Sequence, residues 1–302
     1  MSTVWLFPGQ DAFQPLTGCD WAAADRGVAR LLERVEAEVA LDLRTPRGRR
    51  RLVRFDTAVV QPLLVALCLG IAERLVEAGA VPGAVAGASL GELPAWGLAE
   101  RSPPTEVVEV ALARGAAMRD AAQQTPGGMV ALTGNAEHVQ EALAAGRSAG
   151  IADLAAHNGA EEWVLTGDRP ALAAITAAFP VRPVPVSGPW HSAPMSSAAD
   201  ALERALRRVE VGALQTPMLL NDHGRFAEDG PDVRHHLVRQ LTHPVFWYET
   251  LVALPSRGFT DVVTVGPGRV LRAQLHRTLG SAVRVHGTDD PRALAATLEQ
   301  IP

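Results

Sequence analysis

The 302-residue sequence contains no lysine, so all 28 of its basic residues are arginine. The absence of lysine excludes Schiff-base catalysis and any phosphate-binding loop that ends in a lysine. The formal net charge is -5 at pH 7, whereas nucleic-acid-binding proteins usually present a basic face. We therefore predict no nucleic-acid partner. An acidic protein partner would have to dock on a local patch of arginines.

Cysteine is also scarce, because Cys19 and Cys68 are the only two and lie far apart. Cys68 lies in an apolar helical stretch, which favours a core residue over a nucleophile or half of a disulfide. We interpret no apolar run as long enough to span a membrane. No basic segment precedes the first short apolar run, as one would in a signal peptide. We expect a cytoplasmic protein without a membrane partner.

Sequence patterns for metal ligands are missing too. The chain has no Cys-x-x-Cys, His-x-His or His-Glu-x-x-His pattern and no Asp-x-Asp loop, so we predict no metal site. Gly266-Pro267-Gly268 is a poor nucleotide loop, because it lacks a later glycine and its proline removes an N–H group that a phosphate would need. A rigid turn after a strand is the simpler interpretation of that tripeptide.

Apolar segments of strand length alternate with helical segments along most of the chain. Hydrophobic residues make up 47% of the sequence and charged residues 20%, which is ordinary for a globular protein with a sizeable core. This alternation predicts a mostly parallel sheet with helices on both faces. The expected strands are 3–7, 81–86, 218–220, 261–265 and 283–286. The expected helices are 22–40, 57–78, 105–122, 196–208, 232–241, 247–254 and 270–279, and a basic loop is expected at 44–54.

A composition break at residues 123–128 introduces a segment with its own order of elements. A strand, a helix, two strands, a second helix and a last strand are expected between residues 129 and 186, with Asn158-Gly159 in the turn between the two middle strands. This β-α-β-β-α-β order is typical of a ferredoxin-like unit. We therefore predict an α/β fold in which a ferredoxin-like small lobe, 124–186, is inserted in an α/β-hydrolase-like large lobe, 1–123 and 187–302.

The most informative stretch is Gly87-Ala88-Ser89-Leu90-Gly91, which follows an apolar run and precedes a helix-compatible segment. This is the pattern of a nucleophile elbow, in which a strand turns sharply into a helix with a serine at the apex. The N-terminus of that helix offers backbone N–H groups to a developing oxyanion. The alternative is a glycine-rich turn in an alanine-rich protein.

A nucleophilic serine needs a base, and His191 is the best placed of the nine histidines. It stands in a loop of small residues after an expected strand, and such loops line the sheet edge where Ser89 is expected. His157 and His243 are second choices. The adjacent pair His235-His236 is expected to be structural or exposed. A lone histidine is more often structural than catalytic.

Arg114 lies in the middle of an expected helix, among small residues. One interpretation is an exposed arginine on an alanine-rich helix. The other is a guanidinium that points inward beneath the nucleophile, where its planar fork could hold a carboxylate through two parallel hydrogen bonds. Pro8-Gly9-Gln10, after the first strand, would place further N–H groups at the same sheet edge, although in isolation a simple strand-ending turn is the favoured interpretation.

Together these motifs resemble those of the malonyl-CoA:acyl carrier protein transacylases and of the acyltransferase domains of polyketide synthases. The resemblance runs nearly end to end, in the family's order and spacing. The motifs that carry it are Phe7-Pro8-Gly9-Gln10, Gln61-Pro62, the elbow at 87–92, Arg114-Gly115, Asn158, Trp190-His191-Ser192, Val238-Arg239-Gln240-Leu241, Pro244 before Trp247, and Val265-Gly266-Pro267-Gly268.

The resemblance implies a two-step acyl transfer. Ser89 would take the acyl group as an ester, and His191 would act first as the general base and then as the acid for the leaving thiol. The backbone N–H groups of Gln10 and Leu90 would form the oxyanion hole. The substrates would be an acyl-CoA of the malonyl type and the phosphopantetheine arm of an acyl carrier protein, with no bound cofactor.

Further roles follow from the same resemblance. Arg114 would hold the free carboxylate of the acyl group, and the backbone carbonyl of Gln240 would orient His191. Asn158, Trp190 and Ala88 would line the substrate cleft. The chain departs from the family at Ala88, where the family usually has histidine, at Trp190, and at Asp11-Ala12-Phe13.

Several functions would use the same residues. The chain could transfer acyl groups between carriers, with a group other than malonyl. It could hydrolyse acyl groups from stalled carriers, or serve as the transacylase subunit of a malonate decarboxylase. A non-catalytic docking module is disfavoured, because both Ser89 and His191 are present.

Overall fold

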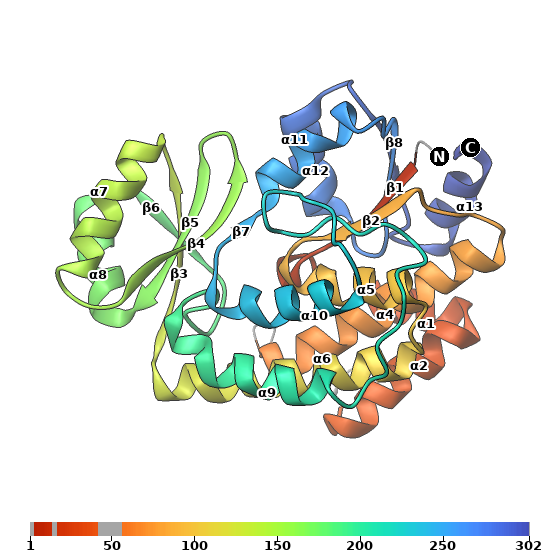
Figure 1. Cartoon of the computed structure of the whole chain (residues 1–302), viewed down its shortest axis with the longest axis horizontal. Helices are drawn as coiled ribbons and strands as arrows, with labels where there is room; N and C mark the ends of the chain where they lie inside the picture. The colour runs from red at the N-terminus through yellow and green to blue at the C-terminus, as the bar shows by residue number, and fades with distance from the viewer. Residues whose placement is uncertain (1–2, 14–16, 42–55, 302) are drawn as a thin grey trace.

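The computed structural model describes residues 3–13, 17–41 and 56–301. The basic segment 44–54 therefore lies outside the described residues. Two sheets organise the described chain, one at each end of the molecule in Figure 1. The first sheet is parallel throughout and has the strand order β2-β1-β8-β9. These strands are β1 (Thr3–Phe7), β2 (Ala84–Gly87), β8 (Asp261–Thr264) and β9 (Arg284–Gly287).

The register of this sheet brings two loops together at its carboxyl edge. Phe7, the last residue of β1, is paired with Gly87, the last residue of β2. The short turns that follow are η1 (Gln10–Ala12) and η2 (Ser89–Gly91), and the Ala88 N–H donates to the Phe7 carbonyl at 2.9 Å. Parallel strands end at a common edge, so residues far apart in sequence meet there.

Helices cover the parallel sheet. The predicted helix 22–40 is two helices, α1 (Thr17–Ala24) and α2 (Arg26–Glu38), because the Asp25 side chain accepts from the Gly27 and Val28 N–H groups and caps the second. The elbow leads into α5 (Glu92–Glu100), and α6 (Pro104–Gln124) carries Arg114 near its middle.

The central helix is α4 (Thr57–Glu77), which is apolar all round and buried along most of its length. Pro62 lies inside α4. Our expectation about membrane spans was wrong on length, because α4 is long and apolar enough to cross a membrane. However, 78% of its most apolar window is buried inside the molecule, as in a core helix.

The second sheet has the order β6-β3-β5-β4-β7, and its first four strands pair antiparallel. The strands β3 (Gly127–Thr133), β4 (Ala152–Gly159), β5 (Glu162–Asp168) and β6 (Val181–Val184) alternate with α7 (Ala136–Arg147) and α8 (Arg169–Ala178) in the predicted β-α-β-β-α-β order. A small apolar core of its own lies beneath the two helices. Asn158 and Gly159 belong to β4, so the predicted turn is displaced to residues 160–161.

The strand β7 (Val245–Phe246) joins this sheet from a distant part of the chain and pairs in parallel with β4. The lobe division at 124–186 remains a prediction, and β7 links the two predicted lobes through backbone hydrogen bonds. Between α9 (Ser196–Leu206) and α10 (Gly230–Arg239), the predicted strand 218–220 forms only bridges, at Met218 to Val85 and at Leu219 to Phe226.

After β6 the described chain consists mainly of helices and short turns. After the short turn η3 (Ala193–Met195), α9 packs along α6. The turn η4 (Gln240–Thr242) follows α10 directly. The remaining helices are α11 (Trp247–Ser256), α12 (Arg269–Leu279) and α13 (Pro291–Gln300), of which α13 was not anticipated. The mixed α/β fold class predicted from the sequence is confirmed.

Candidate active site

Ser89 stands at a sharp, strained turn between β2 and α5. Its φ angle is 49°, in the left-handed region that side-chain-bearing residues rarely adopt. A Cβ at Gly87 would lie 2.0 Å from the Gly91 carbonyl carbon, and one at Gly91 would lie 2.3 Å from the Phe7 oxygen. Both glycines are therefore required by close backbone approach. The interpretation of this stretch as a nucleophile-type elbow agrees with the geometry.

The structure brings Ser89 and His191 together, although 102 positions separate them. The Oγ of Ser89 lies 2.8 Å from Nε2 of His191, and Nδ1 of His191 lies 2.9 Å from the Gln240 carbonyl oxygen. The Gln240 carbonyl can only accept, so Nδ1 carries the proton and Nε2 is free to accept the serine proton. The imidazole is thus in the tautomer that a general base requires.

The surroundings of His191 favour its neutral form. Burial lowers the pKa of His191 to about 4, the nearby Arg114 charge acts in the same direction, and hydrogen bonds to the backbone of Gln240 and His243 oppose both. At neutral pH the imidazole is therefore uncharged and ready to take a proton.

Arg114 is buried rather than exposed, which removes the simpler interpretation of this residue. Its Nη1 donates to the Gln61 side-chain oxygen at 2.6 Å and its Nη2 to the Gln240 side-chain oxygen at 3.3 Å. Burial lowers the pKa of Arg114 to about 10, against an opposing effect of the Glu92 charge, so the guanidinium stays positive at neutral pH. Both guanidinium contacts are to neutral amides. Among the described residues, no carboxylate forms a hydrogen bond with Arg114.

Asn221 holds the elbow from behind and was not anticipated from the sequence. Its side-chain oxygen accepts the Ser89 N–H at 2.7 Å, and its side-chain nitrogen donates to the Gly87 carbonyl at 2.7 Å. The Gly91 N–H is bonded to the Ala88 carbonyl. The N–H groups on either side of Leu90 are thus already engaged, and the Leu90 side chain is buried.

A buried carboxylate, Glu92, completes the site and was also missed. It accepts from the Asn221 N–H at 2.7 Å, from the Gln240 side-chain amide, and from Nε2 of His236 at 3.1 Å to each oxygen. The Gln240 side chain also donates to the Ser89 carbonyl at 3.3 Å. The sequence offered one signal for Glu92, namely its position directly after the elbow. Its full burial, which is uncommon for glutamate, is seen only in the structure.

A cleft of about 160 Å³ opens onto Ser89 and His191. Its walls come from both sheets and are largely apolar, which excludes water from the hydroxyl and the imidazole. The predicted residues Gln10, Ala88, Asn158 and Trp190 all line it, and Arg114 does not. The apolar residues that line the cleft are Met129, Ala156, Val164, Val184, Val186, Val245, Trp247, Val270 and Leu271.

The other candidate histidines do not reach Ser89. His157 bonds Glu249 at 2.7 Å and stacks on Trp163, where it joins β4 to α11. His243 is exposed and contacts its neighbour Thr242. Over the described ranges, no group of three or more His, Cys, Asp and Glu side chains is placed to hold a metal ion. Cys68 is buried in the core, and burial raises the pKa of its thiol.

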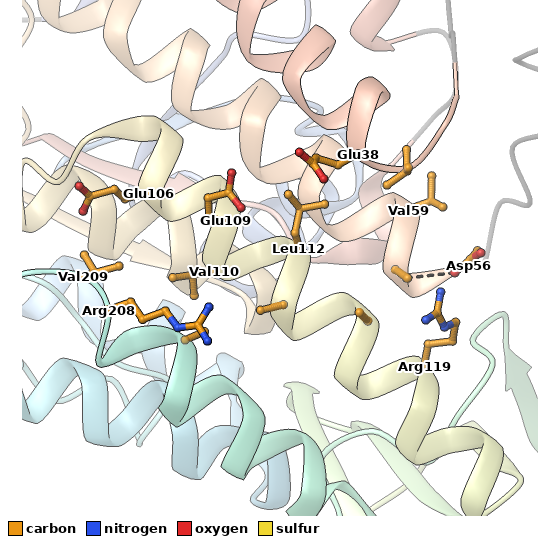
Figure 2. Close-up of a pocket in the computed structure, with 15 residues that line it drawn as sticks. Glu38, Asp56, Val59, Glu106, Glu109, Val110, Leu112, Arg119, Arg208 and Val209 are labelled. Atoms are coloured by element: carbon orange, nitrogen blue, oxygen red, sulfur yellow. Dashed lines mark hydrogen bonds between the residues drawn. The ribbon is translucent and has the colours of Figure 1, made fainter.

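A larger pocket, of about 790 Å³, lies elsewhere (Figure 2). It is bounded by α2, α6, α9 and the start of α4, and the charged side chains around it include Glu38, Glu106, Glu109 and Arg208. Among the residues that the structure describes, no serine, cysteine or histidine lines this pocket, and it shares no lining residue with the cleft at Ser89. The described part of this pocket therefore lacks a serine–histidine pair like that of the cleft.

A strained serine at the edge of a parallel sheet, bonded to a neutral imidazole, is the arrangement of the enzymes that transfer acyl groups through a seryl ester. The chain belongs to the acyl transferase domain family, whose sequence profile matches residues 48–296.

Curated relatives and solved structures agree with this assignment. The chain is 28% identical over 305 residues to the malonyl CoA-acyl carrier protein transacylase of Escherichia coli strain K12, covering 98% of each chain. It is 34% identical over 201 residues to that of Mycolicibacterium smegmatis, covering 64% of this chain and 67% of the relative. A malonyl-transacylase solved in complex with a type II polyketide synthase acyl-carrier protein matches with a TM-score of 0.90 at 27% identity, over 100% of both chains. The acyl-carrier-protein S-malonyltransferase of Bartonella henselae matches with a TM-score of 0.90 at 26% identity, over 99% of each.

Proposed function

We propose that this enzyme transfers a malonyl-type acyl group from CoA, through an ester on Ser89, to the phosphopantetheine thiol of an acyl carrier protein. The observation that carries the proposal is the chain of contacts from Ser89 Oγ to His191 and on to the Gln240 carbonyl, at 2.8 and 2.9 Å. The names of the relatives, which all describe malonyl transfer to a carrier protein, support the choice of substrates.

In the first half-reaction, Ser89 Oγ attacks the thioester carbonyl carbon while His191 Nε2 takes the hydroxyl proton. The carbonyl oxygen becomes an oxyanion, to which we assign the backbone N–H groups of Gln10 and Leu90. The carbon–sulfur bond then breaks, and His191 returns its proton to the sulfur. The products are the CoA thiol and the seryl ester.

The second half-reaction runs the same steps with a new thiol. The phosphopantetheine thiol gives its proton to His191 and attacks the ester carbon, the bond from that carbon to Ser89 Oγ breaks, and the proton goes to the serine. Water would compete for the ester, so the enzyme needs a dry cleft, and the apolar walls supplied by both sheets fit that need. No metal takes part in these steps, and we place the reaction in the cytoplasm, where CoA thioesters are used.

Arg114 is the group we assign to the free carboxylate of the acyl unit. Its guanidinium is positive and buried, and among the described residues its hydrogen bonds are to the amides of Gln61 and Gln240, so a carboxylate would replace or join neutral partners. Since Arg114 does not line the open cleft in this structure, a malonyl group must reach past the imidazole towards the Gln240 amide. Trp190 and Ala88 then shape the space beside the acyl chain.

The test is to incubate the protein with malonyl-CoA and to measure the intact mass, followed by transfer to a phosphopantetheinylated carrier protein. We expect one malonyl adduct on Ser89, none on Ser89→Ala, and an unchanged adduct on the control Ser148→Ala, whose exposed hydroxyl bonds only the Ala145 carbonyl. Release of free malonate without carrier acylation would instead indicate a hydrolase. Turnover that survives in Ser89→Ala would contradict the serine mechanism.

A further inference from the structure

Glu92 is a fully buried carboxylate that His236 contacts directly and that the Gln240 amide connects to Arg114. On one side, its two oxygens each lie 3.1 Å from Nε2 of His236, and its side chain has no exposed surface. On the other side, the Gln240 amide joins it to Arg114, because the amide nitrogen donates to Glu92 and the amide oxygen accepts from Arg114. His236, Glu92, Gln240 and Arg114 therefore form one line of contacts that ends at the group we assign to the acyl carboxylate.

The other charged groups around His236 are paired among themselves. Asp232, on the same helix, and Asp222, in the loop before it, both bond Arg225. Arg239 also lies 3.8 Å from Asp222. From α5 the facing charges are Glu92 and Glu100, and Glu100 pairs with Arg234 of α10 at 3.1 Å. Arg234 also donates to the Leu206 carbonyl of α9. Glu92 is thus the carboxylate left to balance both His236 and Arg114.

We propose that His236 is a specificity-determining residue that, in its protonated form, neutralises Glu92 and so keeps the positive charge of Arg114 available to the carboxylate of the acyl group. This inference rests on the proposed function. If His236 were neutral, the negative charge of Glu92 would act on Arg114 alone. The positive charge of Arg114 would then be largely balanced before the acyl carboxylate arrived, because charges interact strongly in a buried site of low dielectric constant. A neutral acyl group would not sense the difference.

The protonated form of His236 is favoured by its surroundings. Burial by itself would lower the pKa of His236, but the charge and hydrogen bond of Glu92 and the charge of Asp222 outweigh burial and the opposing Arg225, so the pKa is raised. Since the pKa is raised, the cation persists further towards neutral pH and is lost as the pH rises through that value.

His236→Gln tests the proposal, because glutamine can still donate a hydrogen bond to Glu92 but carries no charge. We expect the KM for malonyl-CoA to rise about tenfold at unchanged kcat. A tenfold change in affinity corresponds to an interaction that would shift a pKa by one unit. The KM for malonamyl-CoA, in which an uncharged amide replaces the carboxylate, should stay unchanged. The matched control is His235→Gln, at the exposed neighbouring position of α10, which should alter neither KM.

The outcomes are distinct. Equal changes for both thioesters would overturn the proposal and point to positioning of His191 through Gln240. An unchanged KM for malonyl-CoA would overturn it as well. If the wild-type protein forms no malonyl ester at all, the proposed function has failed rather than this inference.

A second measurement uses the wild-type protein and needs no folded variant. The ratio of the KM for malonyl-CoA to that for malonamyl-CoA should rise with pH as His236 loses its proton, at a pH above the ordinary histidine value because the pKa of His236 is raised. In His236→Gln the ratio should be high and independent of pH. A ratio that is flat in the wild-type protein would overturn the proposal.

Discussion

Asn221→Ala should damage both the stability of the protein and the geometry of its elbow. The wild-type side chain has no exposed surface and makes two hydrogen bonds of 2.7 Å, one from the Ser89 N–H and one to the Gly87 carbonyl. Alanine removes both partners at once. The Asn221 backbone N–H would still reach Glu92, so the loop itself keeps one anchor.

The magnitude follows from the two backbone groups that are left without a partner. A buried donor or acceptor without a partner costs about 1–3 kcal/mol, so the free energy of unfolding should fall by roughly 2–6 kcal/mol. The Ser89 backbone, at a φ of 49°, would also lose the bond that holds it in a strained conformation. A displacement of the serine by about 1 Å would slow acylation on the order of 10²-fold.

Urea-induced unfolding and single-turnover acylation would measure the two effects. The matched control is Asn135→Ala, because the Asn135 side-chain oxygen also accepts a backbone N–H, that of His138 at 3.0 Å, but at the exposed start of α7. Loss of that cap should cost about 1 kcal/mol and leave acylation unchanged. If Asn221→Ala were no less stable than Asn135→Ala and acylated at the wild-type rate, our account of the elbow would be refuted.

Three further predictions concern the same site. Because the pKa of His191 is lowered to about 4, the acylation rate should be constant from neutral pH downwards and fall only as the pH drops through that value; a midpoint near 6.5 would contradict the burial of the imidazole. Arg114→Ala should reduce kcat/KM for malonyl-CoA by about 10- to 150-fold, because about 1.5–3 kcal/mol of charge-assisted hydrogen bonding is lost. The same substitution should raise the pKa of His191, since it removes the nearby positive charge. Equal kinetics for malonyl-CoA and malonamyl-CoA in the wild-type protein would argue against the role of Arg114. Gly87→Ala should prevent folding, because the new Cβ would lie 2.0 Å from the Gly91 backbone. The control is Gly128→Ala, whose Cβ would have a Leu172 side-chain atom at 3.6 Å as its nearest contact, and its midpoint of thermal unfolding should stay close to that of the wild-type protein.

Much of the fold was predictable because its signals are local. The strands β1, β2 and β8 are short, mostly apolar runs that end in or before glycine or turn residues, and the alternation of strands with helices indicated a parallel sheet. The β-α-β-β-α-β order of the second sheet followed from the same signals. The errors also have local causes: Asp25 ends one helix and caps the next, and Asn158-Gly159 stays extended because β4 pairs with β5 through Gly159.

The segment between α9 and α10 was harder to interpret, because its conformation depends on its neighbours. Met218 and Leu219 read as a strand, yet they form only bridges, to Val85 and Phe226. Arg234 braces this segment by donating to the carbonyls of Leu206 and Val209. Such contacts between a side chain and a distant backbone leave no periodic pattern in the sequence.

The sequence by itself indicated the elbow, through Gly87 and Gly91 on either side of Ser89, and it singled out Ser89, His191 and Arg114 as the residues with chemical potential. Only the tertiary structure decided that these groups meet, that Arg114 turns inward, and that Asn221, Glu92 and His236 support them. The physical reason is distance along the chain: the hydrogen bonds at this site join residues about 50 to 150 positions apart. Such partners are selected by how the two sheets and their helices pack, and no local run of residues encodes them.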